Sequence, residues 1–383
     1  MKKAIIAIDS FKGCLTSNEA AQSVARGIKN VYPDCEVIQL PVADGGEGML
    51  EVIKNATNGE YIHLKAHDPL MNVIDTRYAV SGDSRTVLIE MASISGLTLV
   101  PEGKRNPMLT TTYGTGELIR DALDKGYREF IIGIGGSATN DAGLGMLQAL
   151  GYRFLDHSDN ELEYGGQIME KVVTIDDSDI HKGLLESHFT IACDVHNPFC
   201  GENGAAYVYA GQKGADKEMI RELDKGLRSL ASIIQSQLNK DIAHYPGAGA
   251  AGGMGGGFLG FLNSELKPGI KLLLDALHFS EKIEGADLII TGEGKVDRQT
   301  VMGKVSSGIL DEAKKKDIPV IVIAGSIENV EEMNNSGFQA VFSITPSPIP
   351  LEKAMDPNFA AQNMERLVTQ LCRTIDIFNT KPS

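Results

Sequence analysis

At 383 residues the chain exceeds one ordinary domain, and its 42% hydrophobic and 23% charged residues are typical of a folded globular protein. Its net charge of −15 disfavours nucleic acid and anionic membrane surfaces as partners. A small anionic substrate is still compatible with this charge where lysines, backbone amides or a metal ion offset the field locally.

Cysteine usage and the first residues indicate a reducing compartment. The five cysteines are scattered and form no CxxC pair, which fits free thiols better than a disulfide framework. The opening MKKAIIAIDSFKG has a short apolar run, but Asp9 interrupts it before a signal-peptide core or a membrane span would be complete. We therefore expect a cytoplasmic protein whose first apolar run is a strand.

The first sixty residues repeat a strand followed by a helix. Apolar runs cover residues 4–8 and 36–42, and the pattern predicts helices over about 19–31 and 49–55. Alternation of this kind is typical of a parallel sheet, in which ligands bind beyond the carboxyl ends of the strands. We therefore expect the loops after the two strands to face a site. These loops contain Asp9, Ser10, Lys12, Asp44, Gly45, Gly46 and Glu47.

The pattern changes between residues 60 and 90. Apolar and polar residues alternate, and turn signals stand at Asp68-Pro69 and Gly82-Asp83, which predicts antiparallel strands. The sequence therefore predicts a domain boundary near Ala66.

Residues 130–145, FIIGIGGSATNDAGLG, combine a buried strand, a glycine loop and a predicted helix over residues 142–150. The glycines allow a sharp turn close to a ligand, and polar residues suited to helix caps follow them. A loop before a helix N-terminus favours anions, because free amide groups and the helix dipole point into it. We therefore expect a phosphate site here. Its residues would be Gly135, Gly136, Ser137, Thr139 and Asn140.

Three further elements complete the middle of the chain. Residues 189–193 form a predicted strand that ends at Asp194, and residues 217–238 carry one apolar stripe, typical of a helix that faces the core. Residues 247–257, GAGAAGGMGGG, are either a flexible linker or a loop pressed against a ligand or another backbone. The second interpretation is favoured because apolar residues resume at once over 258–262.

The strand and helix alternation of the first sixty residues returns after residue 286. Strands are predicted over 288–291, 319–324 and 340–344, and helices over about 303–315 and 359–378. Because the two ends share an architecture that the middle lacks, we expect one discontinuous parallel α/β domain over residues 1–66 and 286–383. A mixed α/β domain over residues 67–285 would be inserted into it.

Two sequence motifs bear on nucleotide binding. Gly133-x-Gly135-x-x-Ala138 fits the dinucleotide pattern, with Asp156 roughly where a ribose-binding acid would fall, but the polar run SATND is unusual for a helix that packs tightly on a sheet. No G-x-x-x-x-G-K-[ST] occurs, which argues against a P-loop mechanism.

Acidic residues at strand ends are more informative. Asp44, Asp194 and Asp297 each follow a predicted strand, beside small residues that leave the carboxylate accessible. A single loop aspartate is usually a cap or turn residue. Three of them, together with Lys12 and Lys295, suit a site that binds Mg²⁺ and phosphate oxygens and takes a proton from a hydroxyl group.

Eight ordered motifs resemble the bacterial glycerate kinase family nearly end to end. They are DSFKGCLTSNEAA (9–21), PVADGGEGM (41–49), GTGELI (114–119), GIGGSATNDAGLG (133–145), ACDVHNPFCGENGAA (192–206), QKGA (212–215), PGAGAAGGMGGG (246–257) and DLIITGEGKVDRQT (287–300). The departures are Cys14 for a usual serine, Met49 for threonine, Ala142 for glycine and Ser306 near a frequent proline. Only Ala142 touches a predicted ligand loop, where it adds one methyl group.

The resemblance implies ATP-dependent phosphorylation of D-glycerate with Mg²⁺. It also implies a cleft between a flavodoxin-like domain and a restriction-endonuclease-like domain, which agrees with the discontinuity inferred above. The family's usual bacterial members give 2-phosphoglycerate, so this product is favoured over 3-phosphoglycerate.

The hypothesis assigns roles to the candidate residues. Asp194 is the first candidate for base or metal ligand, followed by Asp44 and Asp297, with Asp194 and Asp297 as the metal ligands. Lys12 and Lys295 would bind anionic oxygens of substrate or nucleotide. The residues expected to bind the ATP phosphates are Gly135, Gly136, Ser137, Thr139 and Asn140, and those expected to bind substrate are Ser10, Lys12, Asp44, Gly45 and Gly46.

Two alternatives stay open at this point. An NAD(P)-dependent oxidoreductase of a small hydroxy acid would use the same glycine loop. A non-catalytic hydroxy-acid-binding protein would have no need of three exposed aspartates at strand ends.

Overall fold

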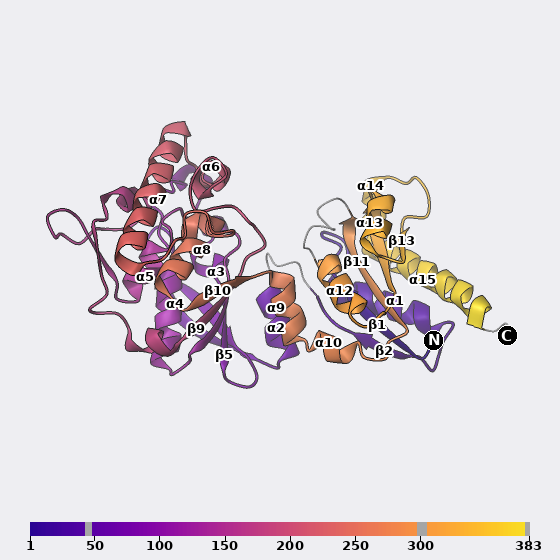
Figure 1. Ribbon diagram of the computed structural model, residues 1–383. Helices are drawn as coiled ribbons and strands as arrows, with labels where there is room; N and C mark the ends of the chain where they lie inside the picture. Colours follow the sequence, from indigo (N-terminus) through magenta and orange to yellow (C-terminus); the bar gives the residue numbers. More distant parts are fainter. Residues whose placement is uncertain (43–47, 297–304, 380–383) are drawn as a thin grey trace. The chain divides into compact units, whose positions relative to one another are not determined.

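The computed structural model describes residues 1–42, 48–296 and 305–379. The chain divides into two compact units, one built from Met1–Asp44 with Ile270–Ser383 and the other from Gly45–Gly269 (Figure 1). We call them unit 1 and unit 2, and each is described by itself. The chain starts in unit 1, completes unit 2 and returns. No helix among the described residues is long and apolar enough to cross a membrane.

Unit 1 contains a five-stranded sheet in the order β13-β12-β11-β1-β2, and every pair of neighbours is parallel. The strands are β1 (Lys3–Ile8), β2 (Glu36–Gln39), β11 (Leu288–Val296), β12 (Val320–Ile327) and β13 (Ala340–Ser343). β1 lies inside the sheet, between β11 and β2, and its residues from Ala4 to Ile8 are apolar and buried, as in a strand covered on both faces. β11 extends farther than the sequence indicated, so Lys295 is the next-to-last residue of the strand and does not lie in a loop.

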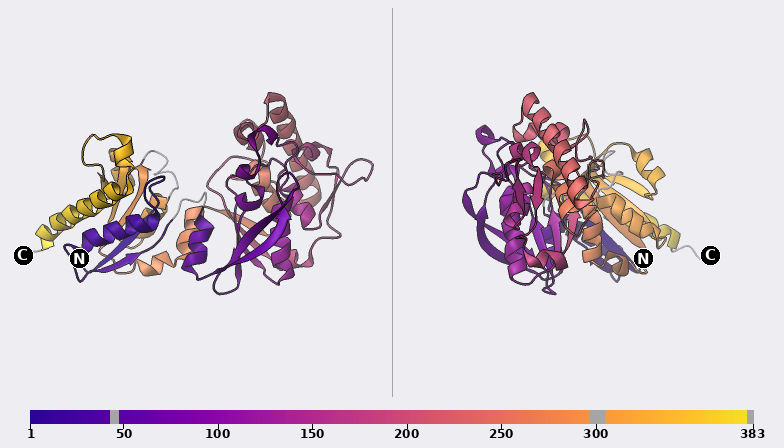
Figure 2. Two further views of the ribbon diagram at one scale, coloured as in Figure 1. Left: turned by 180° about the vertical axis from the view of Figure 1, so that it is seen from behind. Right: turned by 60° about the vertical axis from the view of Figure 1, so that its left-hand side comes forward.

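The helices of unit 1 are α1 (Ser17–Lys29), α9 (Gly269–Ala276), α10 (Phe279–Lys282), α12 (Val305–Lys314), α13 (Val330–Ser336), α14 (Leu351–Ala354) and α15 (Pro357–Asn379). α1 begins where it does because Thr16 and Glu19 form a capping box. α1 and α15 lie side by side in Figure 1 and in the left-hand view of Figure 2. Gly27 permits this approach, since a Cβ there would lie 2.8 Å from the carbonyl oxygen of Glu365.

Unit 2 contains a six-stranded mixed sheet in the order β10-β9-β6-β5-β4-β3. The strands are β3 (Glu60–His67), β4 (Val73–Val80), β5 (Thr86–Glu90), β6 (Glu129–Gly133), β9 (His188–Ala192) and β10 (Ser264–Lys267). β3, β4 and β5 pair antiparallel, as the alternation indicated, and the remaining pairs are parallel. β7 (Arg153–Leu155) and β8 (Thr174–Asp176) form a separate antiparallel pair.

The boundaries between the two units differ from those expected near Ala66 and residue 286. β3 pairs with β4 along its whole length, so residues 60–66 belong to the sheet of unit 2. An alternating pattern predicts a strand but does not show which sheet the strand joins, which explains why the first boundary was placed too late. Residues from Ile270 onward belong to unit 1 because α9 packs there, with Ile270 against Gly308 of α12.

The helices of unit 2 surround its sheet and include one long element. They are α2 (Met49–Ala56), α3 (Ala92–Ser95), α4 (Tyr113–Asp124), α5 (Leu144–Ala149), α6 (Ala205–Tyr209), α7 (Lys217–Leu238) and α8 (Ala250–Phe261). Five short 3₁₀ segments join them: η1 (Leu97–Leu99), η2 (Glu102–Lys104), η3 (Gly166–Lys171), η4 (Lys182–Glu186) and η5 (Gly211–Lys213). α7 has the predicted bounds, and Leu223, Leu227 and Leu230 of its apolar stripe are buried.

The glycine-rich stretch 247–257 is packed backbone and not a linker. A Cβ at Gly252 would lie 2.2 Å from the carbonyl oxygen of Thr139, and one at Gly257 would lie 2.2 Å from that of Ala142. The amide of Ala142 donates to the carbonyl of Gly252 at 3.1 Å. The predicted packing of this stretch against another backbone is therefore confirmed, but its residues from Ala250 onward belong to helix α8 and not to a loop.

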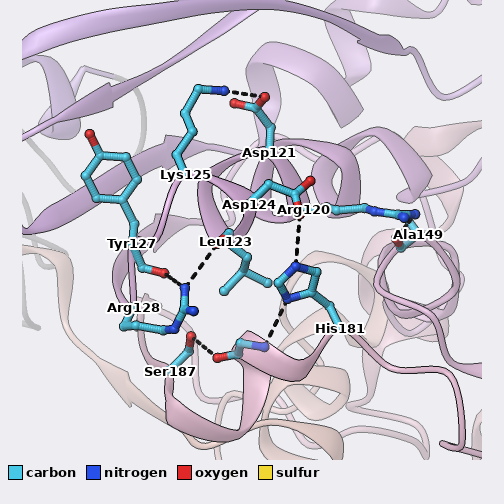
Figure 3. A network of polar contacts seen from close by, with 11 residues as sticks. Arg120, Asp121, Leu123, Asp124, Lys125, Tyr127, Arg128, Ala149, His181 and Ser187 are labelled. Carbon is cyan, nitrogen blue, oxygen red and sulfur yellow. Dashed lines mark hydrogen bonds and ion pairs between the residues drawn. The ribbon is translucent and has the colours of Figure 1, made fainter.

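A polar network joins the C-terminal end of α4 to η4 (Figure 3). Arg128 donates to the carbonyl oxygens of Leu123 and Tyr127, at 3.1 and 2.7 Å, and His181 lies 3.0 Å from Asp124. The amide of His188 donates to the carbonyl of Arg128, so the network lies where β6 and β9 begin. Because ligands of parallel sheets bind where strands end, we interpret this network as structural.

Candidate active site

The carboxyl edge of the unit 1 sheet has the geometry of a ligand site. From β1 the chain proceeds to β2 on one side, whereas from β11 it proceeds to β12 and β13 on the other. Loops leave in opposite directions at such a switch point, which opens a crevice between neighbouring strands. A pocket of about 910 Å³ lies at this edge and is called the unit 1 pocket below. Its lining residues come from the loop after β1, the ends of β11 and β12, and the segment 343–355.

One side of the unit 1 pocket is polar. Asp9, Ser10 and Lys12 line it from the loop after β1, and Lys295 lines it from β11. Asp9 is buried, and its carboxylate accepts a hydrogen bond from the amide of Ser10 at 2.6 Å. Lys12 is exposed, whereas Lys295 lies 2.9 Å from the carboxylate of Glu328. The structure thus brings Ser10, Lys12 and Lys295 of the predicted set around one pocket.

The other side of the unit 1 pocket is apolar, and its residues were not among the predicted site residues. It is formed by the segment after β13, with Pro346, Pro348, Ile349, Leu351 and Met355. Leu351 is 76% exposed. The only signal for this wall was the position of residues 345–350 after a predicted strand of the same sheet.

The predicted phosphate loop of unit 2, residues 133–141, has a different shape from the one expected. Gly135 and Gly136 are exposed, but Ser137 is buried and Thr139 and Asn140 are completely covered. Helix α5 begins at Leu144 and not at residue 142. The expected start was wrong because Ala142 and Gly143 both have positive φ, 53° and 78°, far from the dihedral angles of a regular α-helix.

Asp141 occupies the position in which an anion was expected. Its carboxylate accepts hydrogen bonds from the amides of Gly143 and Gly145 at the start of α5, at 3.2 and 3.3 Å. It also accepts from the amide and hydroxyl of Thr112, at 2.8 and 2.9 Å. Complete burial raises the pKa of Asp141, and these hydrogen bonds act in the opposite direction. The expectation that this helix start is free for a ligand is therefore wrong.

Lys213 of η5 contacts this loop and was not among the predicted site residues. It is 2% exposed, and its ammonium donates to the Ser137 hydroxyl and to the Thr139 carbonyl, both at 2.6 Å. Burial lowers the pKa of Lys213 to about 7, and the charge of Asp141 opposes this shift. QKGA was visible as a motif, but nothing in the sequence showed that its lysine reaches a loop 76 positions away.

Two neighbouring side chains of the loop carry unused hydrogen-bonding capacity. Among the described residues, neither polar side-chain atom of Asn140 has a partner, and the hydroxyl of Thr139 has none. Both residues are 0% exposed. Buried polar atoms are normally paired, because an unpaired one costs about 1–3 kcal/mol. Three buried polar atoms in two adjacent residues that have no partner in the described part of the chain are therefore unusual, and they lie in the predicted loop.

Asp194 lies at the same edge of the unit 2 sheet as the glycine loop. It follows β9, which neighbours β6 with Ala192 opposite Gly133. Asp194 is exposed, and its carboxylate accepts a hydrogen bond from the amide of Gly269 at 2.8 Å. The other predicted residues Asp44, Gly45, Gly46 and Asp297 lie outside the described residues. In the described ranges no group of three or more His, Cys, Asp or Glu is arranged to hold a metal ion.

Comparisons with known proteins agree over the full length of the chain. Residues 4–376 match the glycerate kinase family. A glycerate kinase of Halalkalibacterium halodurans is 44% identical over 381 residues, 99% of each chain. The glycerate 2-kinase of Escherichia coli K12 is 45% identical over 353 residues, 92% of this chain and 93% of that protein.

A solved structure gives the same result. The crystal structure of "putative glycerate kinase 2" from Salmonella typhimurium LT2 covers 99% of this chain and 100% of its own, with a TM-score of 0.88 and 42% identity. With sequence and structure in agreement from end to end, the chain belongs to the glycerate kinase family.

Proposed function

We propose that the protein transfers the γ-phosphoryl group of ATP to a hydroxyl group of D-glycerate, and that 2-phosphoglycerate is favoured over 3-phosphoglycerate. The observation that carries the proposal is the family match over residues 4–376. The choice of product is supported by the similarity to a relative described as a glycerate 2-kinase. In the reaction the glycerate oxygen bonds to the γ-phosphorus, the bond from that phosphorus to ADP breaks, and the hydroxyl proton passes to a base.

The domain architecture proposed with this function is a discontinuous flavodoxin-like domain and an inserted mixed α/β domain of the restriction-endonuclease-like kind. The strand order β2-β1-β11-β12-β13 supports the first part, since flavodoxin-like sheets have the order 2-1-3-4-5. The mixed sheet of unit 2, with three antiparallel strands at one side, is compatible with the second part.

Asp194 is proposed as the base or as a metal ligand, and Asp44 and Asp297 are alternatives for the same roles. Support comes from its exposed position at the end of β9. Lys12 and Lys295 are proposed to neutralise anionic oxygens of substrate or nucleotide, since both line the unit 1 pocket. Ser10, Gly45 and Gly46 complete the proposed substrate set.

The glycine loop is proposed to bind ATP phosphates. Gly135 and Gly136 support this role best, because their backbone is exposed. Ser137, Thr139 and Asn140 belong to the same proposal, but their burial makes a supporting position beneath the turn the better description of their side chains. Lys213 would stabilise that position through its bonds to Ser137 and Thr139.

Mg²⁺ fits the donor set to a limited degree. Protein sites for ATP-bound Mg²⁺ usually supply one or two carboxylates, while phosphates and water supply the other ligands. The exposed carboxylate of Asp194 meets that requirement, and Asp297 is proposed as the second ligand. When bound, the ion would neutralise charge on the phosphate oxygens. The described residues offer no closed protein cage for it.

An NAD(P)-dependent oxidoreductase is the weaker candidate. A dinucleotide site needs a helix directly after its glycine loop and an acid at the end of the next parallel strand. Here α5 has six residues, and its first amides are bound by Asp141. Asp156 follows β7, which belongs to the separate antiparallel pair and not to the main sheet. A non-catalytic hydroxy-acid-binding protein is also disfavoured, because it would not need an exposed carboxylate such as Asp194.

The test is ADP release with Mg-ATP across a panel of small hydroxy acids. We expect release that depends on D-glycerate, and phosphorus NMR of the product then distinguishes 2- from 3-phosphoglycerate. Absence of glycerate-stimulated ADP release would overturn the proposal. A nicotinamide absorbance change without ADP release would favour the oxidoreductase.

A further inference from the structure

The volume of the unit 1 pocket is the first argument about its occupant. Pockets of about 300–1,000 Å³ typically enclose ligands of drug size. The unit 1 pocket, at about 910 Å³, is near the upper end of that range. D-Glycerate has only three carbon atoms, so it would leave most of this space empty. The pocket therefore fits a larger molecule than the proposed phosphoryl acceptor.

The apolar wall is the second argument. Leu351 is 76% exposed and Met355 is 36% exposed, and Pro346, Pro348 and Ile349 continue the same wall. Exposed apolar side chains gathered around a hollow commonly mark a binding surface. Glycerate carries a carboxylate and two hydroxyls and has almost no apolar surface to bury. A flat aromatic base has such surface on both faces, and a methionine sulfur adds favourable contact with a ring.

The charges on the polar side are the third argument. Lys12 and Lys295 line the pocket together with the carboxylates of Asp9 and Glu293. Lys295 also pairs with Glu328. Two cations beside two carboxylates do not balance a whole triphosphate, so Lys12 and Lys295 would neutralise only the anionic oxygens nearest the ribose, whereas hydroxyl and carboxylate groups suit the hydroxyls of the ribose. The lining therefore matches the nucleoside part of a nucleotide better than its phosphate chain.

We propose that the unit 1 pocket binds the adenosine part of ATP, with the base against the wall formed by residues 346–355. This inference rests on the proposed kinase function, which supplies the nucleotide. It assigns the nucleoside to the switch point of the unit 1 sheet, where the loop after β1, the ends of β11 and β12 and the segment after β13 line the pocket.

Cys14 provides a direct test, because it lines the pocket and is the one cysteine of the five that is not buried. Burial, Asp356 and Glu19 raise the pKa of its thiol, so labelling with N-ethylmaleimide should be done at mildly alkaline pH. We expect Mg-ATP, ADP and free adenosine at saturation to slow labelling of Cys14 at least fivefold. D-Glycerate should leave it within twofold, because a three-carbon acid held by Ser10 and Lys12 is too small to fill the pocket. Mass spectrometry of the labelled peptide identifies the site, and Cys14→Ser removes the signal.

The labelling tests the pocket assignment independently of whether the protein has kinase activity. Protection by D-glycerate but not by adenosine would overturn the inference, and so would absence of protection by any adenine nucleotide. Protection by adenosine in a protein that releases no ADP would leave the inference standing while the proposed function fails.

A matched pair of leucine variants tests the wall by kinetics. Leu351→Glu changes an exposed side chain at the pocket, so the fold should tolerate it. We expect the KM for ATP to rise at least tenfold, with the KM for glycerate within twofold of wild type. Leu185→Glu is the control, because Leu185 is 79% exposed on η4 of unit 2 and should leave both constants unchanged. An unchanged KM for ATP in Leu351→Glu, or a rise only for glycerate, would refute the assignment.

Discussion

Substitution of Gly252 by alanine tests whether the glycine-rich stretch is packed backbone. Gly252 has a φ of +70°, and a Cβ there would lie 2.2 Å from the carbonyl oxygen of Thr139 and 2.6 Å from the Cα of Asn140. The left-handed conformation costs an alanine about 1–2 kcal/mol, and relief of the overlap adds about 1–3 kcal/mol. We therefore expect Gly252→Ala to lower the free energy of unfolding of unit 2 by about 2–5 kcal/mol.

Two other glycines of unit 2 separate the causes. Gly126 has a φ of +92° with nothing within 4 Å of the added Cβ, so Gly126→Ala should show the conformational cost alone, about 1–2 kcal/mol. Gly257 lies in α8 without positive φ, but its Cβ would lie 2.2 Å from the carbonyl oxygen of Ala142. Gly257→Ala should therefore show the overlap alone, about 1–3 kcal/mol.

Urea unfolding followed by circular dichroism measures these effects. Because two units can unfold in separate transitions, hydrogen exchange of peptides from β6 and β9 should identify the transition that belongs to unit 2. If Gly252→Ala destabilises unit 2 no more than Gly126→Ala does, the close approach of the two backbones is not a real constraint.

Three further predictions concern the pH response, the proposed base and a helix cap. Because the pKa of Lys213 is lowered to about 7 from 10.5, its buried charge destabilises the fold fully below pH 7, and the cost fades as pH rises toward 10.5. The unfolding free energy of wild type minus that of Lys213→Met should therefore rise between pH 7 and 9, by up to about 1.4 kcal/mol per pH unit; a flat difference in urea titrations would contradict this. Asp194→Asn should lower kcat by about 10²–10⁴, as loss of a general base does, and turnover within about threefold of wild type would exclude that role. Thr16→Ala should destabilise unit 1 by about 1 kcal/mol in urea, whereas Glu19→Gln, which keeps the capping box, should have a smaller effect.

The sequence predicted correctly those elements whose position depends on the pattern of neighbouring residues. The apolar run of β1 and the stripe of α7 are visible in the residues themselves, and both elements lie where the sequence placed them. The start of α5 was misplaced because the conformation of Ala142 depends on a hydrogen bond to Gly252, a residue far along the chain. Propensity alone favours helix at an alanine, and a tertiary contact overrides it.

The candidate site shows the same division. Ser10, Lys12 and Lys295 could be placed at one edge because the ends of parallel strands converge there. Lys213 could not be assigned to the glycine loop from the sequence, because its hydrogen bonds with Ser137 and Thr139 arise from the packing of η5 on that loop. The apolar wall of the unit 1 pocket could not be predicted either, since only the folded structure shows that Leu351 and Met355 line a pocket.

The discontinuity of unit 1 has a consequence for synthesis of the protein on the ribosome. β1 pairs with β2 soon after both emerge, but its other neighbour, β11, begins only at Leu288. At roughly 5–20 residues per second, β1 waits about 15–60 s for that partner. Unit 2 is complete by Gly269, so it can fold first, while an almost wholly apolar strand edge stays open. The time during which nascent chains are most prone to aggregate is therefore determined by the length of the insertion.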